Sequence, residues 1–346
     1  MSENPGFKRA KKLLERYGGE VDDFFKFWPT DKTFFFSSDG HACLAYRAYR
    51  KVAVCTFDPI GPAVSVRQLL KEFSAFCTAR HWQFVFVQTT DKYDSALARV
   101  GMKRLLIGSD AVIPIQEFNT KTIHNKYFRN IVNRFNKHGF TVRRHIPPHS
   151  PELLAALKEV SDDWLKLPHH EEWQFLTGRF DEEYLQACPL FVLRDQASAI
   201  QAFFTELPSF KSGVASIDLI RHRRDALSNS VDFLLIELMR QLELDGLTDF
   251  NLGLSPLAGQ PFARSRVEHF IIWFYKTFQS FMRFKGLQQF KSKYHPNWEP
   301  RYLYSSGNVW QLPRIGWSIM RLMGRYRPED VANKQSADLP VTAIEG

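Results

Sequence analysis

The sequence predicts a mixed α/β protein in two halves, and three observations lead to this fold class. Segments that alternate like strands and segments with helical spacing of apolar residues follow one another along the chain. A Pro147-Pro148 pair interrupts them near the middle of the 346 residues. Hydrophobic residues make up 44% and charged residues 24%, as in a soluble globular protein. We expect domains at 1–148 and 149–328, and a polar, disordered tail at 329–346.

The first half is expected to open with a basic helix and to continue with strands and further helices. The helix over Phe7–Tyr17 stops at Gly18-Gly19, and the turn Asp39-Gly40 separates the first two strands. One helix is expected over Thr120–His138, with Gly139 ending it. The other elements expected here are strands at Thr33–Ser38, His41–Arg47, Lys51–Thr56, Trp82–Gln88, Leu105–Ile115 and Phe140–His145, and helices at Val66–Thr78 and Ser95–Val100.

The second half begins with a clear helix start, because Ser150 is a good N-cap residue and Pro151 suits the first helical position. Amphipathic spacing extends this helix to Trp164, and an aromatic helix is expected at Glu268–Phe284. The aromatic stripe indicates either core packing or the wall of a lipid cavity. The remaining expected elements are helices at Asp181–Gln186 and Val231–Asp245, and strands at Leu190–Arg194, Ile200–Leu207, Gly213–Ile220 and Asp249–Leu254.

The charge balance favours an anionic partner. With 46 Lys and Arg against 37 Asp and Glu, the net charge is +9, which suits nucleic acid, an anionic lipid surface or a phosphorylated ligand. Residues 118–151 contain basic residues and no acid, so they predict a tRNA or phosphate surface. A solvated helix face balanced by acids elsewhere is the alternative interpretation. The residues expected on this surface are Lys121, Lys126, Arg129, Arg134 and Lys137.

A second acid-free run, 300–328, places arginines beside large apolar side chains. Such a segment suits an anionic membrane interface, and a helix packed on the domain is equally compatible with it. The expected membrane contacts are Arg314, Trp317, Arg321 and Arg325. No apolar stretch is long enough to span a bilayer, and the N-terminus lacks a secretory signal. The 4 cysteines are scattered, which predicts neither disulfides nor a zinc site and favours a reducing cytoplasm.

Two groups of residues can carry chemistry. Asp218 and Arg221 lie at the end of an apolar strand, where such a pair can orient an amine or hydroxyl and stabilise developing charge. An ordinary ion pair closing the strand is the alternative. Lys291 and Lys293 can bind phosphate or an oxyanion, or belong to an ordinary surface strand. The chain has no phosphate-binding loop, zinc-helix motif or nucleophile elbow, so we expect neither a metal mechanism nor a covalent serine mechanism.

Taken together, several runs resemble the C-terminal catalytic domain of bacterial phosphatidylglycerol lysyltransferases, also called aminoacyl-phosphatidylglycerol synthases. The resemblance covers roughly residues 15–305, and its strength lies in the order and spacing of the runs. The matching runs are Asp31-Lys32 before Phe34–Phe36, Ala45–Arg47, Asp58–Gly61, Val160–Asp162 with Trp164-Leu165, Gly178–Asp181 with Tyr184-Leu185, Ser216–Arg221, Phe250–Leu257, and Phe284–Leu287 leading to Phe290-Lys291.

This resemblance implies two tandem acyltransferase domains of the GNAT type. It also implies transfer of an aminoacyl group from aminoacyl-tRNA onto a hydroxyl of phosphatidylglycerol, without a cofactor. The family's Asp-x-x-Arg matches Asp218 and Arg221, and its late lysine best matches Lys293, which gives three expected catalytic residues. The substrate-binding residues that the resemblance implies are Asp181, Tyr184, Asn251, Ser255 and Lys291.

The family usually carries membrane-spanning helices ahead of this domain, and they are missing from this sequence. We therefore expect peripheral association with the inner face of the cytoplasmic membrane, through the protein's own surface or a separate membrane protein. One alternative function is a GNAT-type acyl-CoA N-acyltransferase, although the turn Arg221–Ser230 lacks the glycines that usually bind pyrophosphate. The other is a non-catalytic module that binds tRNA or membrane.

Overall fold

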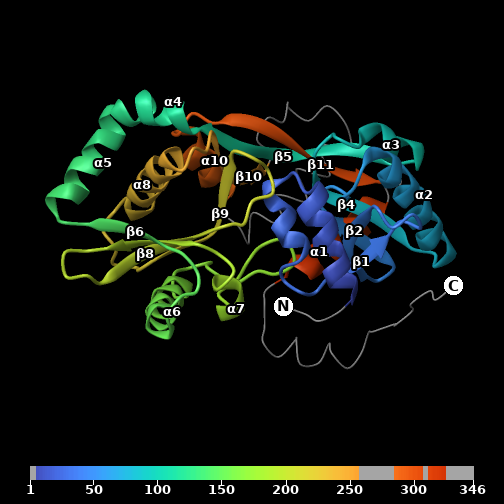
Figure 1. The fold of residues 1–346 in the computed structure, drawn as a ribbon, viewed down its shortest axis with the longest axis horizontal. Coiled ribbons are helices and arrows are strands. Elements are labelled where there is room, and N and C mark those ends of the chain that lie inside the picture. Colours follow the sequence, from blue (N-terminus) through green and yellow to red (C-terminus); the bar gives the residue numbers. More distant parts are fainter. Residues whose placement is uncertain (1–4, 257–283, 307–310, 325–346) are drawn as a thin grey trace.

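The fold is taken from a computed structural model that describes residues 5–256, 284–306 and 311–324 (Figure 1). The expected aromatic helix at 268–284, apart from Phe284, lies outside these residues, as do Arg325 and the tail at 329–346. Within the described part of the chain, no helix is both long enough and apolar enough to cross a membrane.

The first half contains six strands, and its elements run up to the proline pair. In chain order they are α1 (Pro5–Tyr17), η1 (Val21–Lys26), β1 (Thr33–Phe36), β2 (Cys43–Tyr49), β3 (Val52–Thr56), α2 (Ala63–Ala79), β4 (Gln83–Thr89), α3 (Asp94–Arg99), β5 (Lys103–Pro114), α4 (Ile115–Thr120), η2 (Thr122–His124), α5 (Lys126–Lys137) and β6 (Thr141–His145).

The second half begins as predicted, since the Ser150 hydroxyl accepts the Leu153 N–H and caps the first helix. The described elements are α6 (Pro151–Leu165), α7 (Glu182–Leu185), β7 (Leu190–Arg194), β8 (Ile200–Glu206), β9 (Val214–His222), α8 (Ser230–Leu244), β10 (Asp249–Pro256), α10 (Phe284–Ser292), β11 (Asn297–Ser305) and α11 (Leu312–Met323).

The two halves repeat one topology. In the first, three antiparallel strands lead through α2 to β4, which is parallel to β3. In the second, β7, β8 and β9 lead through α8 to β10, which is parallel to β9. The predicted α/β class and the tandem arrangement are therefore both present in the strand pairing.

The halves share one sheet because their last strands meet in its centre. The strand order is β1-β2-β3-β4-β11-β5-β10-β9-β8-β7-β6. Strand β5 of the first half pairs with β10 of the second, and β11 of the second half inserts between β4 and β5. The hydrogen bonding of the sheet continues across the boundary that the sequence predicts near residue 148 (Figure 1).

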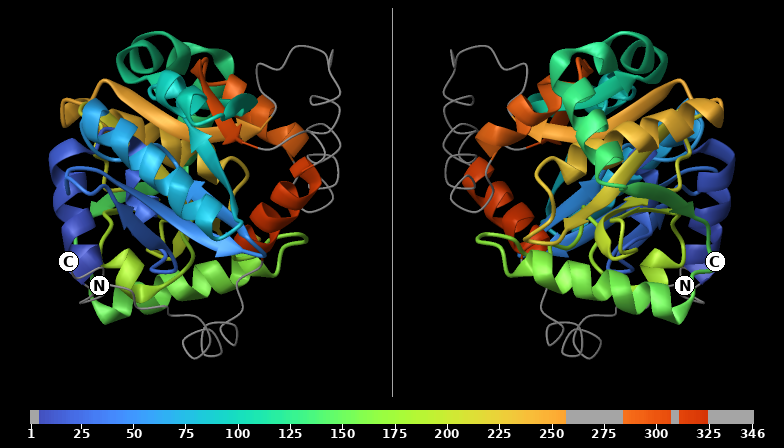
Figure 2. Two further views of the ribbon diagram at one scale, coloured as in Figure 1. Left: turned by 90° about the vertical axis from the view of Figure 1, so that its right-hand side faces the viewer. Right: turned by 90° about the vertical axis from the view of Figure 1, so that its left-hand side faces the viewer.

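Helices cover both faces of the second half of the sheet. Neighbouring residues of β8 show this, because Phe203 packs in the core that contains α6 and Phe204 in the core that contains α8. Figure 2 shows α6 on the side of the molecule opposite to α4 and α5. All four cysteines are free and buried, and Cys188 lies in the core that contains α6.

The structure differs from the expected elements at several positions. The 3-10 helix η1 was not expected, and Lys291 lies on helix α10 and not on the surface strand that was the alternative for it. The single helix expected over Thr120–His138 is divided into α4, η2 and α5. The break falls at Asn125, whose extended backbone and side-chain oxygen cap a new helix by accepting the Phe128 N–H. Strand β11 was not expected, because Glu299-Pro300 interrupts its strand pattern. Gly139 ends α5 with a φ of +68°, as predicted.

Candidate active site

The parallel strands β9 and β10 separate shortly after they begin. Their pairing covers Val214 to Ser216 on β9 and ends at Asn251 on β10, whereas β3 and β4 pair along the whole of β3. The cause is a bulge in β10, where Gly253 has a φ of +80° and its N–H is held by the Asn251 side chain at 2.7 Å. The rest of β9, which carries Asp218 and Arg221, is therefore not hydrogen-bonded to β10. We call the place where these two strands separate the strand opening.

Asp218 is bound from two sides. The Tyr184 hydroxyl donates to its Oδ2 at 2.7 Å, and the Gly178 backbone donates a second hydrogen bond. Burial raises the pKa of Asp218 to about 6, although both hydrogen bonds and Arg221 act in the opposite direction. The carboxyl group thus titrates close to neutral pH, which suits a group that exchanges protons.

Gly178 is needed because no side chain fits there. A Cβ at this position would lie 2.0 Å from Asp218 Oδ2 and 2.8 Å from Tyr184 Cζ. In the sequence, Gly178 appeared only as part of the matching run Gly178–Asp181. The strand pattern around Asp218 did not indicate that Gly178 contacts this residue.

Arg221 is buried, with 6% of its surface exposed. Its guanidinium carbon lies 3.8 Å from the centre of the Trp164 ring, and its Nη2 lies 3.0 Å from Glu172 Oε2. Its Nε has no hydrogen-bond partner among the described residues. Glu172 was missed by the sequence reasoning, because it lies in a loop without periodicity, forty-nine positions before its partner.

Tyr184 and Asp181 come from the short helix α7. Asp181 is its N-cap and accepts the Tyr184 N–H at 3.2 Å, which fixes the turn. The Tyr184 ring is fully buried and stacks on Trp28 with centroids 5.5 Å apart. Of these two residues, Tyr184 touches Asp218 directly, and Asp181 supports the helix that carries it.

Lys291 reaches the bulge in β10 from α10. Its Nζ donates to the carbonyl oxygens of Gly253 and Leu254, each at 2.8 Å, and only 4% of the residue is exposed. Burial lowers its pKa to about 8, against the opposing effect of Asp110. In the register of β9 and β10, Gly253 would lie opposite Asp218, so Lys291 is attached to the strand across the opening.

Lys293 lies in a different environment. Its ammonium group pairs with Asp232 in the first turn of α8, and it is 3.3 Å from the Tyr127 hydroxyl and 4.0 Å from the Phe290 ring centre. The Tyr294 hydroxyl also donates to Asp232. Among the described residues, no contact joins Lys293 to Asp218 or Arg221, and its catalytic role stays a prediction.

The two remaining expected substrate-binding residues lie inside the sheet. Asn251 donates to Asp110 at 2.9 Å and is 2% exposed, so it shapes the bulge. Ser255 is fully buried, and its hydroxyl has no hydrogen-bond partner among the described residues. Within the same residues, no group of His, Cys, Asp and Glu side chains could hold a metal ion.

The predicted tRNA surface lies on α5, at one end of the long axis in Figure 1. Lys126, Arg129 and Lys137 are exposed there. Arg134 instead donates to the Ser228 carbonyl oxygen and to Asn229, and Lys121 pairs with Glu117 at 3.3 Å. Three of the five predicted residues are therefore exposed to solvent on this helix.

The predicted membrane helix is α11, and its two faces differ. Ile315, Ile319 and Leu322 are buried against the first half, which is the packing alternative. Arg314, Trp317 and Arg321 occupy the exposed face. Trp317 is 45% exposed and stacks with Arg321, so a basic and aromatic stripe remains at the surface.

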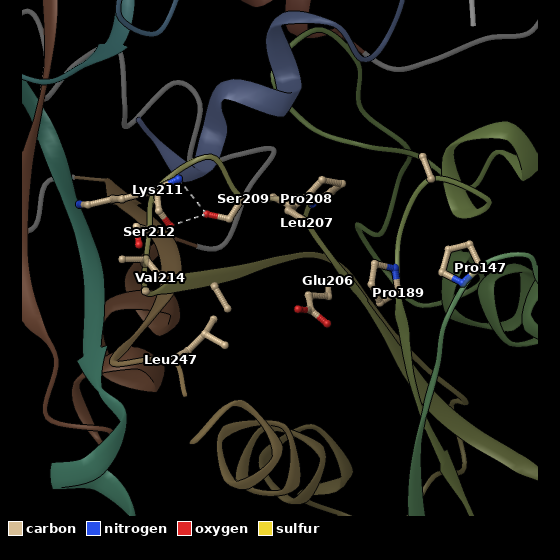
Figure 3. Close-up of a pocket in the computed structure, with 13 residues that line it drawn as sticks. Pro147, Pro189, Glu206, Leu207, Pro208, Ser209, Lys211, Ser212, Val214 and Leu247 are labelled. Carbon is tan, nitrogen blue, oxygen red and sulfur yellow. Dashed lines mark hydrogen bonds between the residues drawn. The ribbon is translucent and has the colours of Figure 1, made fainter. Parts of the chain in front are cut away.

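A cavity of about 650 Å³ lies elsewhere, around the start of β9 (Figure 3). Figure 3 shows Glu206, Leu247 and Val214 around its centre. None of the predicted site residues lines it. The cavity is therefore separate from Asp218 and Arg221.

Comparison with known proteins agrees with this arrangement. A solved structure of L-PGS from Bacillus licheniformis is similar with a TM-score of 0.81 and 32% identity, over 94% of this chain and 99% of that chain. Phosphatidylglycerol lysyltransferases from Staphylococcus xylosus and Staphylococcus aureus (strain MRSA252) are each 30% identical, over 85% and 88% of this chain. The chain spans only 35% and 36% of these two relatives.

The fold and the opened strand pair thus define a two-unit α/β protein of the kind found in L-PGS. The sequence model described as "Phosphatidylglycerol lysyltransferase, C-terminal" matches residues 11–305. The chain belongs to this family, and the resemblance noted from its sequence is confirmed.

Proposed function

We propose that this protein is an aminoacyltransferase that moves an aminoacyl group from aminoacyl-tRNA onto a hydroxyl of phosphatidylglycerol. The observation that carries the proposal is the Asp218 and Arg221 pair on the part of β9 that no longer pairs with β10, in a chain that belongs to the lysyltransferase family. The relatives' name supplies the lipid and the class of reaction.

The proposed reaction exchanges one ester for another. The lipid hydroxyl oxygen bonds to the ester carbonyl carbon, and the bond from that carbon to the terminal ribose oxygen of the tRNA breaks. The hydroxyl proton ends on the ribose oxygen. Because the aminoacyl ester is already activated, the protein needs to position the two substrates and to stabilise the negative charge on the carbonyl oxygen.

The residues divide these tasks according to their surroundings. Arg221 has a buried cation with an unused Nε donor, which suits the developing oxyanion. Asp218 suits either removal of the hydroxyl proton or binding of the α-ammonium group, since its pKa of about 6 leaves it ionised at neutral pH. Lys291 and Lys293 are the two lysines proposed to bind the remaining negative charge. The hydrogen bonds from Lys291 to the carbonyl oxygens of Gly253 and Leu254 support this role for Lys291.

The start of α8 argues against the acyl-CoA alternative. Acyltransferases that use CoA bind its pyrophosphate through free backbone N–H groups at a helix N-terminus. In this chain Asp232 lies in that first turn with its negative charge, and Tyr127, Tyr294 and Lys293 cover it. A second anion would meet a carboxylate at this place.

We propose two surfaces for the two substrates. The exposed cations of α5 would bind tRNA phosphates, and the stripe on α11 would hold the protein to the inner face of the cytoplasmic membrane. Both expectations rest on exposed charge, and neither requires a spanning helix.

Lipid chromatography tests the function. Purified protein is incubated with labelled aminoacyl-tRNAs and phosphatidylglycerol vesicles, with neutral phosphatidylcholine vesicles as the control. We expect a labelled aminoacyl lipid from at least one charged tRNA, without CoA and only with the anionic lipid. Failure of every aminoacyl-tRNA, together with turnover of acetyl-CoA, would replace this proposal by the acyl-CoA alternative.

A further inference from the structure

The loop between α6 and α7 lies over the strand that carries the catalytic pair, and it holds both members of that pair. At one point Glu172 Oε2 is 3.0 Å from Arg221 Nη2, and further along the backbone of Gly178 donates to Asp218. The other Glu172 oxygen accepts the Phe180 N–H at 3.3 Å, so the carboxylate also ties the loop to itself.

Arg221 is held by two side chains. The Trp164 ring centre lies 3.8 Å from its guanidinium carbon, and Glu172 accepts a hydrogen bond from its Nη2. A buried guanidinium is stable only with a carboxylate or another acceptor beside it. Glu172 is the acidic side chain that forms an ion pair with Arg221, and Asp218 contributes through its charge.

The carboxylate leaves donors of Arg221 available for a substrate. A guanidinium has five N–H donors, and Glu172 engages those of Nη2, while Nη1 makes a long contact of 3.5 Å to the Ile220 carbonyl oxygen. The buried Nε has no partner among the described residues. By binding Nη2, Glu172 therefore fixes the orientation of the guanidinium group and of its remaining N–H donors.

We propose that Glu172 is a positioning residue, which orients Arg221 toward the ester carbonyl oxygen of the aminoacyl group. This inference rests on the function proposed above. Glu172 itself does not touch the reacting atoms; it acts through Arg221, and Trp164 contacts the same guanidinium.

The kinetic test compares Glu172→Gln and Glu172→Asp with the control Glu182→Gln, which changes an exposed glutamate at the start of α7. We expect Glu172→Gln to lower kcat by roughly 10- to 100-fold, as expected when a catalytic group is displaced by about 1 Å, with little change in KM. Glu172→Asp keeps the charge and should recover part of the rate. The control should match the wild-type protein.

The pH profile tests whether the charge of Glu172 acts on the site. The charged and titratable groups facing Asp218 are Tyr184, Cys188, Arg221 and Glu172. The negative charge of Glu172 raises the pKa of Asp218, so its removal should move the acid limb of kcat to lower pH. A limb that stays in place, or wild-type kcat in Glu172→Gln, would overturn the proposal.

A measurement without substrate keeps this test independent of the proposed function. In protein labelled with ¹⁵N-arginine, the Arg221 Nε–H signal is assigned by its loss in Arg221→Lys. Glu172→Gln should shift this signal and speed its exchange with water, and Glu182→Gln should leave it unchanged. An unchanged signal in Glu172→Gln refutes the positioning role even if transfer fails, whereas absence of transfer in the wild-type protein refutes only the function.

Discussion

At the scale of the residue, the fold makes ionisation of the Asp218 carboxyl group less favourable than it is in water. Burial raises its pKa from the ordinary value near 3.8 to about 6, although Tyr184 and Gly178 donate hydrogen bonds to it. A folded-state pKa above the unfolded one means that the folded protein favours the protonated form. The stability that this proton contributes is complete below about pH 4 and is lost as the pH rises through about 6.

Asp218→Asn should therefore abolish transfer while making the protein more stable at pH 7.5. The expected gain is on the order of 1–3 kcal/mol, since one pKa unit corresponds to about 1.4 kcal/mol. Asparagine can still accept the Tyr184 hydrogen bond, so the fold is retained. Thermal unfolding at pH 4 and pH 7.5 measures this, and the gain should vanish at pH 4. Equal stability of the two proteins at both pH values would contradict the burial argument.

Gly178 provides a second test at the residue scale. In Gly178→Ala, the new Cβ would collide with Asp218 Oδ2 and the Tyr184 ring, so we expect at least a tenfold loss of transfer and a destabilisation of about 1–3 kcal/mol. Gly286→Ala is the matched control, because no atom lies within 4 Å of its Cβ in helix α10. The control should be neutral or slightly stabilising. Normal activity of Gly178→Ala would show that the loop is not tightly packed on Asp218.

At the scale of elements, the two parallel strand pairs differ, and the proposed site lies beside the pair that separates. Strand β3 stays paired with β4, whereas the bulge at Gly253 turns β10 away from β9 and leaves its carbonyl groups to Lys291. The second half also has an ion pair at the start of its helix α8. Asp232 in the first turn of α8 pairs with Lys293, which directly follows α10 and contacts Tyr127 of α5.

Lys293→Met should destabilise the protein by about 2–4 kcal/mol, because Asp232 would remain buried without its cation. Adding Asp232→Asn should restore most of this stability, since the uncompensated charge is gone. Chemical denaturation of the single and double variants measures both effects. The transfer rate of the stable double variant then reports the contribution of Lys293 to the reaction itself. Additive losses in the double variant would refute the coupling.

The sequence predicted elements where local signals were strong, and it failed where distant partners decide. Ser150 and Gly139 were found because caps depend on local residue types. The break at Asn125 was missed, since a helical apolar period continues across it. Asp218, Arg221 and Tyr184 were expected from the resemblance and lie together, but Glu172 contacts Arg221 across a long loop, which no local pattern encodes.

At the scale of the whole molecule, the exchange of β5 and β11 makes the two halves a single sheet. Around this sheet, α5 of the first half packs against α8 of the second half, and α11 of the second half packs against β2 and β3 of the first half. The two charged surfaces proposed for tRNA and for lipid therefore lie on different helices, and they can be altered separately.

The membrane surface is tested with Arg314→Gln, Trp317→Ala and Arg321→Gln in one protein. Each basic residue near an anionic surface contributes about 1 kcal/mol, so loss of two should weaken binding to phosphatidylglycerol vesicles more than tenfold. The buried residues of α11 are unchanged, so the fold is retained. Vesicle sedimentation at low and high salt measures the affinity. Wild-type binding by this variant would leave α11 with only its packing role.

The tRNA surface is tested with Lys126→Gln, Arg129→Gln and Lys137→Gln, which remove three exposed cations of α5 and spare Arg134, a residue tied to Ser228 and Asn229. Each phosphate contact contributes about one unit to the slope of log Kd against log salt, so this slope should fall by about 2 to 3 units. The α11 variant serves as the control, because it also lowers the net charge but should bind tRNA normally. Conversely, the α5 variant should bind vesicles like the wild-type protein. If both variants weaken tRNA binding equally, the overall charge attracts the tRNA and α5 is not its specific docking surface.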